Sequence, residues 1–101
     1  MHPYIIINRK VFEKALNASL KMFNIESDLF FLQAAYRPLT ECRHFFYFLL
    51  RSNQINSKYI RLYMEEHGFI AYKQLIHKGF KICQSKYGGS PEIIKLVKSI
   101  K

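Results

Sequence analysis

The pattern that most constrains the fold of this chain lies between Ser57 and Ser85. It indicates two helices joined by a tight turn at residues 67–69, because Gly68 permits the left-handed backbone that often follows a helix end. Residues 72–85, placed about 100° apart as in an α-helix, separate into an apolar side and a polar side. The polar side comprises Lys73, Gln74, His77, Lys78, Lys81, Gln84 and Ser85. We therefore expect a helix over about residues 70–85 that packs on a core and offers its other face to a partner.

The rest of the chain also has helical periodicity, and no second strand-like segment accompanies the β-prone Tyr4–Ile7. We expect a compact all-α bundle of about six helices, with a helix-turn-helix at about residues 57–85. The whole chain, residues 1–101, is expected to form a single helical domain. Within it we expect an N-terminal arm at residues 1–8 and a helix-turn-helix core with a C-terminal helix at residues 40–101.

Several boundaries are predicted from local chemistry. Arg37-Pro38 is expected to end a well-buried helix at about residues 28–36, because a proline disfavours helical geometry in the residue before it. The next helix, about residues 41–52, is the most hydrophobic and is expected to form the centre of the core. Ser57 and Ser90 are expected to cap the helices that follow them.

The net charge of +9 is distributed unevenly along the chain. Residues 1–36 carry a net charge of +1, whereas residues 37–101 carry +8. The basic character therefore accompanies the predicted helix-turn-helix. Charge alone is compatible with DNA, RNA, an anionic membrane or an acidic protein as the partner.

Other classes of function lack their sequence signatures. No nucleophile–base motif or phosphate-binding glycine-rich loop is present, so we expect no enzyme, no cofactor and no small-molecule substrate. Cys42 and Cys83 stand far apart without a metal-ligand spacing, which indicates free thiols, no metal and a reducing compartment. Neither a signal peptide nor a membrane span is evident, and we expect a soluble cytoplasmic protein.

If the partner is DNA, the basic residues fall into two groups, and the first group is expected to contact phosphates. Lys58 and Arg61 suit this role, with Ser57 at the N-terminus of their helix. Arg43 and Arg51 recur on one edge of the preceding helix and are expected to extend the basic track.

The second helix of the motif is expected to approach the bases. Lys73, Gln74 and His77 occupy its first two turns, where glutamine can pair with adenine and lysine with guanine. Lys78 and Lys81 lie further along and are expected to meet the phosphate backbone. The predicted partner is double-stranded DNA.

From Arg43 onward the sequence resembles the C-terminal DNA-binding domain of the bacterial replication initiator DnaA, a Trp-repressor-like helix-turn-helix. An arginine-led apolar helix, RHFFYFLLR at residues 43–51, is followed by a polar loop and a helix that opens at Ser57. The family motif V-[IM]-H-x-x-[RK]-K-[IV] is similar to LIHKGFKI at residues 75–82. The resemblance covers about residues 43–101. It implies this fold and a DNA-contacting surface in a bacterial or phage-encoded protein that acts as a repressor-like or replication-accessory factor.

The family's box-reading segment, D-H-[ST]-T, is replaced here by AYKQ at residues 71–74. Recognition of the initiator's box and ATP binding are therefore not expected. The alternative is a non-enzymatic interaction module, such as a virion or phage accessory protein, whose basic helical face meets an acidic partner. In either case Tyr4–Ile7 is a candidate contact for a homodimer or another protein.

Overall fold

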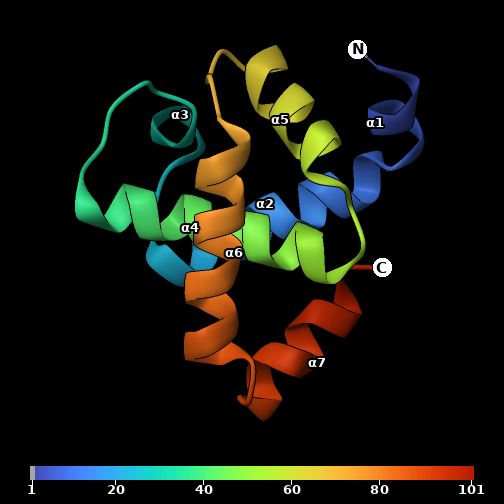
Figure 1. The fold of residues 1–101 in the computed structure, drawn as a ribbon, viewed down its shortest axis with the longest axis vertical. Helices are drawn as coiled ribbons and strands as arrows, with labels where there is room; N and C mark the ends of the chain where they lie inside the picture. The colour runs from blue at the N-terminus through green and yellow to red at the C-terminus, as the bar shows by residue number, and fades with distance from the viewer. Residues whose placement is uncertain (1) are drawn as a thin grey trace.

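The computed structural model describes residues 2–101, which form seven helices and no strand (Figure 1). The helices are α1 (Pro3–Ile7), α2 (Arg9–Phe23), α3 (Ser27–Phe30), α4 (Arg37–Ser52), α5 (Ser57–Glu66), α6 (Lys73–Tyr87) and α7 (Pro91–Ser99). The expected all-α bundle is confirmed, with one helix more than predicted.

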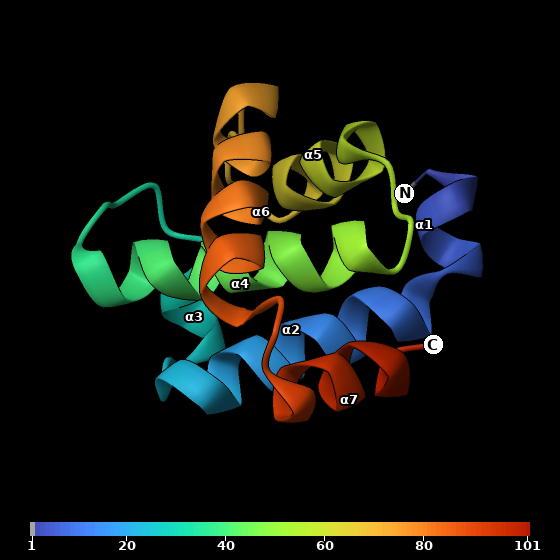
Figure 2. The ribbon, with the colours of Figure 1, turned by 60° about the horizontal axis from the view of Figure 1, so that its bottom comes forward.

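Helix α4 forms the centre of the core, as its composition predicts. Phe45, Phe46 and Leu49 are fully buried along it. Figure 2 shows α4 between α2 on one side and α5 and α6 on the other, and its most extensive contacts are with α6 and α2. A helix with neighbours on both sides must be apolar around most of its circumference, which explains the run of phenylalanine and leucine.

The N-terminal segment is a short helix and not the extended arm that Tyr4–Ile7 suggested. Pro3 occupies the first turn of α1, where its missing N–H costs no hydrogen bond, and the His2 side chain accepts from the Tyr4 N–H. Ile5 is buried, and the Tyr4 ring stacks on Tyr59 of α5 with ring centroids 3.8 Å apart. The β-prone residues of this segment have no strand to pair with among the described residues, and contacts with α5 hold them in a helix instead.

The predicted helix at residues 28–36 is wrong beyond its first turn. Helix α3 ends at Phe30, and Leu32 in the loop that follows is 51% exposed. Pro38 lies in the first turn of α4 instead of ending the previous helix. Proline is tolerated at this position because the first N–H groups of a helix have no intrahelical acceptor.

The connection between α5 and α6 is longer than the predicted turn. Gly68 adopts the expected left-handed backbone with φ of +89°, but α6 begins only at Lys73. Phe69 and Ala71 are buried in the core, and the Ile70 N–H donates to Gln33 Oε1 at 2.9 Å. These contacts hold the connection in an extended form. The cap of α7 is confirmed, since Ser90 Oγ accepts from the Ile93 N–H.

Candidate nucleic-acid interface

The outer face of α6 carries the polar side chains that the helical pattern placed there. These residues are all exposed: Lys73, Gln74, His77, Lys78, Lys81, Gln84 and Ser85. The helix contains four lysines and no acidic residue. The opposite side is buried at Ile76, Gly79 and Cys83, although Leu75 and Ile82 remain 43% exposed. The amphipathic helix is therefore confirmed, with a basic face that no carboxylate of its own neutralises.

The first turns of α5 and α6 meet around an open hollow of about 230 Å³. Asn56, Ser57, Lys58, Arg61 and Lys73 line it, and none of these five residues is acidic. Four of them belong to the predicted DNA surface, although Lys73 is separated from the others in sequence. Three cationic side chains around one hollow make this an anion-attracting part of the surface.

Asn56 determines how α5 begins, and sequence reasoning assigned its role to Ser57. The Asn56 side chain accepts from the Lys58 N–H at 2.9 Å, so Ser57 is the first helical residue and not the cap. Asparagine and serine are both favoured caps, so the pair Asn-Ser is compatible with either start. Lys58 and Arg61 then lie one turn apart near the positive end of the α5 dipole.

Arg43 does not extend the basic track, and that prediction is corrected. It is only 5% exposed, because the loop after α3 and the Phe69 ring enclose its side chain. Its Nε donates to the Phe30 carbonyl at 2.9 Å and its Nη1 to the Ala34 carbonyl at 2.7 Å. Its Nη2 donates to the Leu32 carbonyl, so this side chain holds the loop after α3.

Arg51 is half-buried, and part of its guanidinium group already interacts with other residues of the protein. Its Nη1 donates to the Ile55 carbonyl at 3.2 Å, and its guanidinium lies 5.8 Å from the centroid of the Phe80 ring. Its side chain is therefore less accessible to a partner than the exposed side chains of Lys58 and Arg61.

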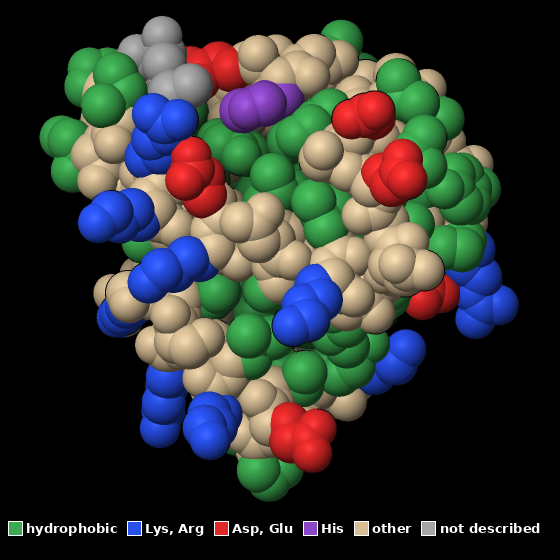
Figure 3. All heavy atoms as spheres, turned by 180° about the vertical axis from the view of Figure 1, so that it is seen from behind, with side chains coloured by type: hydrophobic (Ala, Val, Ile, Leu, Met, Phe, Trp, Pro, Cys, Tyr) green, Lys and Arg blue, Asp and Glu red, His purple; other side chains and the backbone are tan. Residues whose placement is uncertain are grey.

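The face behind α6 carries side chains of both charges. In Figure 3 several basic side chains lie along one edge of this face, acidic side chains are scattered over it, and apolar patches are exposed between them. Two ion pairs, Arg9–Glu13 at 2.7 Å and Arg37–Glu41 at 2.9 Å, join neighbouring turns of α2 and α4. Arg9 and Arg37 are therefore paired with carboxylates, whereas α6 carries no carboxylate of its own.

The cysteines and histidines do not gather into a site. Cys42 and Cys83 are free and buried, and burial raises the pKa of the Cys42 thiol to about 12 and that of Cys83 to about 11. Among residues 2–101, no group of three His, Cys, Asp or Glu side chains is arranged to hold a metal ion. None of the described helices is long and apolar enough to cross a membrane.

The interface therefore unites Ser57, Lys58 and Arg61 with Lys73 and the outer face of α6. Residues 71–74 stand where the DnaA family has its box-reading segment. In this structure Ala71 is buried, Tyr72 precedes α6, and only Lys73 and Gln74 lie on the helix. Comparison of the chain with protein-family models, curated proteins and solved structures finds no match.

Proposed function

We propose that this protein binds double-stranded DNA through α5 and α6, used as a helix-turn-helix, in a repressor-like or replication-accessory role. The observation that carries the proposal is the hollow where Lys58 and Arg61 of α5 meet Lys73 of α6. It adjoins a helix face with four lysines and no carboxylate. A phosphate group would be attracted to Lys58 and Arg61 on the α5 side of this hollow while α6 lies in the major groove.

The exposed side chains divide between two roles. Lys58 and Arg61, with Lys78 and Lys81 further along α6, contact phosphates and supply most of the affinity. Lys73 and Gln74 begin α6, and His77 follows one turn later, so these three reach base edges. Arg43 takes no part, because its guanidinium donates to three backbone carbonyls.

The test is the salt dependence of binding to a fluorescently labelled duplex of about 20 base pairs. Each neutralised phosphate contributes about −0.9 to the slope of log affinity against log salt concentration. Four contacts, from Lys58, Arg61, Lys78 and Lys81, predict a slope of about −3.6. Absence of binding at low salt, or a flat dependence on salt, contradicts DNA binding.

Sequence preference is tested separately by selection from random duplexes at near-physiological salt. An enriched motif supports a regulator that reads bases with Lys73 and Gln74. Binding without a motif supports a packaging or accessory role in which phosphate contacts dominate.

A protein partner is the second candidate, and exposed apolar residues on α1 favour it. Ile6 is 55% exposed and Ile7 is 82% exposed on a helix of five residues. Side chains of this kind commonly contribute to protein contacts when they cluster. If Ile6→Asp with Ile7→Asp abolishes self-association or capture of an acidic protein while DNA binding is absent, the interaction module is the better description.

A further inference from the structure

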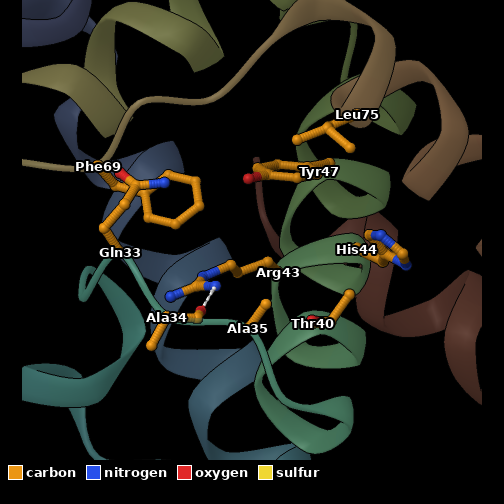
Figure 4. Close-up of a pocket in the computed structure, with 9 residues that line it drawn as sticks. All are labelled: Gln33, Ala34, Ala35, Thr40, Arg43, His44, Tyr47, Phe69 and Leu75. Carbon is orange, nitrogen blue, oxygen red and sulfur yellow. Dashed lines mark hydrogen bonds between the residues drawn. The ribbon is translucent and has the colours of Figure 1, made fainter.

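An open cavity of about 240 Å³ lies on the side of α4 that faces the loop after α3 (Figure 4). Ala34 and Ala35 of that loop form one wall, and Phe69 and Leu75 contribute an apolar wall from the connection and α6. Arg43 and Tyr47 reach into the same space from successive turns of α4. The cavity is thus apolar at its sides and polar along α4.

Arg43 is a buried cation without an acidic partner. Among residues 2–101 the ion pairs are confined to Arg9–Glu13 and Arg37–Glu41. Three of the five N–H groups of Arg43 donate to backbone carbonyls, which leaves two free. The Phe69 ring covers one guanidinium face, with its centroid 4.2 Å from Cζ. Buried charges in proteins are normally paired, so this cation favours an anion beside it.

Tyr47 provides a second unused donor in the same cavity. The residue is 3% exposed, and its hydroxyl has no hydrogen-bond partner among residues 2–101. The hydroxyl oxygen is open to the cavity, because no fully enclosed side-chain oxygen or nitrogen of the described residues lacks a partner. Figure 4 shows the hydroxyl directed into the space between Phe69 and Arg43. A phenol keeps its proton at physiological pH and can donate, and burial raises the pKa of Tyr47 further. A donor that is open to the cavity is available to a ligand bound there.

We propose that this cavity binds a small organic monocarboxylate with a compact apolar or aromatic body. The carboxylate accepts hydrogen bonds from the free N–H groups of Arg43 and from the Tyr47 hydroxyl. The body of the ligand lies against Phe69, Leu75 and Ala35. A volume of about 240 Å³ is below the usual range of about 300–1,000 Å³ for drug-sized ligands, which limits the occupant to a small molecule.

The apolar walls distinguish this ligand from inorganic anions and from DNA phosphate. Phosphate is strongly hydrated and gains nothing from contact with Phe69 or Leu75, whereas an aryl or branched aliphatic group buries apolar area there. The cavity is also separate from the hollow at Lys58, Arg61 and Lys73, because the two share no lining residue. Binding at this cavity therefore does not depend on the proposed DNA-binding function.

The test is an NMR titration of the complete ¹⁵N-labelled chain without DNA. Phenylacetate is the probe, and phenylacetamide, acetate and phosphate are matched comparisons. We expect saturable shifts at the amides of Ala35, Phe69 and Leu75, with a dissociation constant on the order of 1 mM or tighter. Phenylacetamide is expected to bind at least about tenfold more weakly, because it lacks the charge that Arg43 pairs. Equal binding of the amide, or no saturable shift with about 10 mM phenylacetate, overturns the proposal.

Two variants assign the binding to this cavity. Tyr47→Phe removes the donor and keeps the ring, and it is expected to weaken phenylacetate binding by about tenfold. Ala35→Leu fills the cavity from an exposed loop position and is expected to abolish binding. Tyr72→Phe, the same change at a tyrosine 61% exposed, is the control and should bind like the parent protein. Unchanged binding by both folded cavity variants, checked by their melting curves, would show that the ligand lies elsewhere and would refute the site.

Discussion

Gly79 of α6 lies directly against His44 of α4. A Cβ atom at position 79 would stand 2.7 Å from His44 Cδ2 and 3.0 Å from His44 Cα. The second of these atoms belongs to the backbone and cannot turn aside as a side chain can. Glycine therefore fixes how closely α6 crosses the central helix, and with it the position of the basic face relative to the core.

Gly79→Ala is expected to destabilise the fold by about 1–3 kcal/mol, because α6 must move away from α4 to admit the methyl group. Alanine's helix propensity, about 1 kcal/mol better than glycine's, offsets part of this cost. Urea unfolding followed by circular dichroism measures the difference. Gly89→Ala is the control, since a Cβ there meets nothing within 4 Å, and it should be neutral or slightly stabilising. A neutral Gly79→Ala would contradict the tight crossing.

Acid is expected to destabilise the protein through His44. Its pKa is lowered mainly by burial and further by the nearby positive charge of Lys78. In the unfolded chain the His44 imidazole takes up a proton near about pH 6.5, whereas in the folded protein it does so only at lower pH. Protonation therefore favours the unfolded state, and the free energy of unfolding decreases as the pH falls below about 6.5. Unfolding free energies measured between pH 5 and 8 should show the decline. His44→Gln should flatten it, and an unchanged slope in that variant would assign the effect to other groups.

The two thiols are expected to resist alkylation in the folded protein. Because burial raises the pKa of Cys42 to about 12 and that of Cys83 to about 11, almost no thiolate is present at neutral pH. The thiolate is the reactive form, so iodoacetamide should modify neither cysteine until the chain unfolds. Mass spectrometry after timed exposure, with and without urea, measures the protection. Equal rates in the two conditions would contradict the burial of these side chains.

Substitutions on the DNA surface are expected to separate affinity from sequence preference. Lys58→Ala with Arg61→Ala should weaken binding to all duplexes alike. Loss of these two phosphate contacts should also make the slope of log affinity against log salt concentration less negative by about 1.8. Lys73→Ala with Gln74→Ala should instead blunt preference among sequences.

The control for these variants is Lys10→Ala with Lys14→Ala, which removes two exposed lysines from α2 on another part of the surface. Titrations of the three double variants against one preferred and one unrelated duplex provide the comparison. If the α2 variant loses as much affinity as the α5 variant, binding reflects net charge and not the α5–α6 surface.

The parts of the fold that depend on neighbours in sequence could be predicted. The period of apolar residues identified α2, α4, α5, α6 and α7, and it predicted which side of α6 is exposed. Gly68 adopts the left-handed backbone expected just past a helix end. The error in the bounds of α3 and α4 lies where two local signals compete, because Pro38 can end one helix or begin the next.

The sequence by itself determined that this chain is helical, that its charge is concentrated after residue 36, and that α6 has a basic face. These properties follow from composition and from a period of about 3.6 residues, which are local. Only the tertiary structure decided which basic side chains reach solvent. Arg43 and Lys73 look equally available in the sequence. In the structure Arg43 is enclosed by the loop after α3 and by Phe69, whereas Lys73 borders the hollow with Lys58. Burial depends on which helix covers which, and packing between distant segments is not encoded in any single helical pattern.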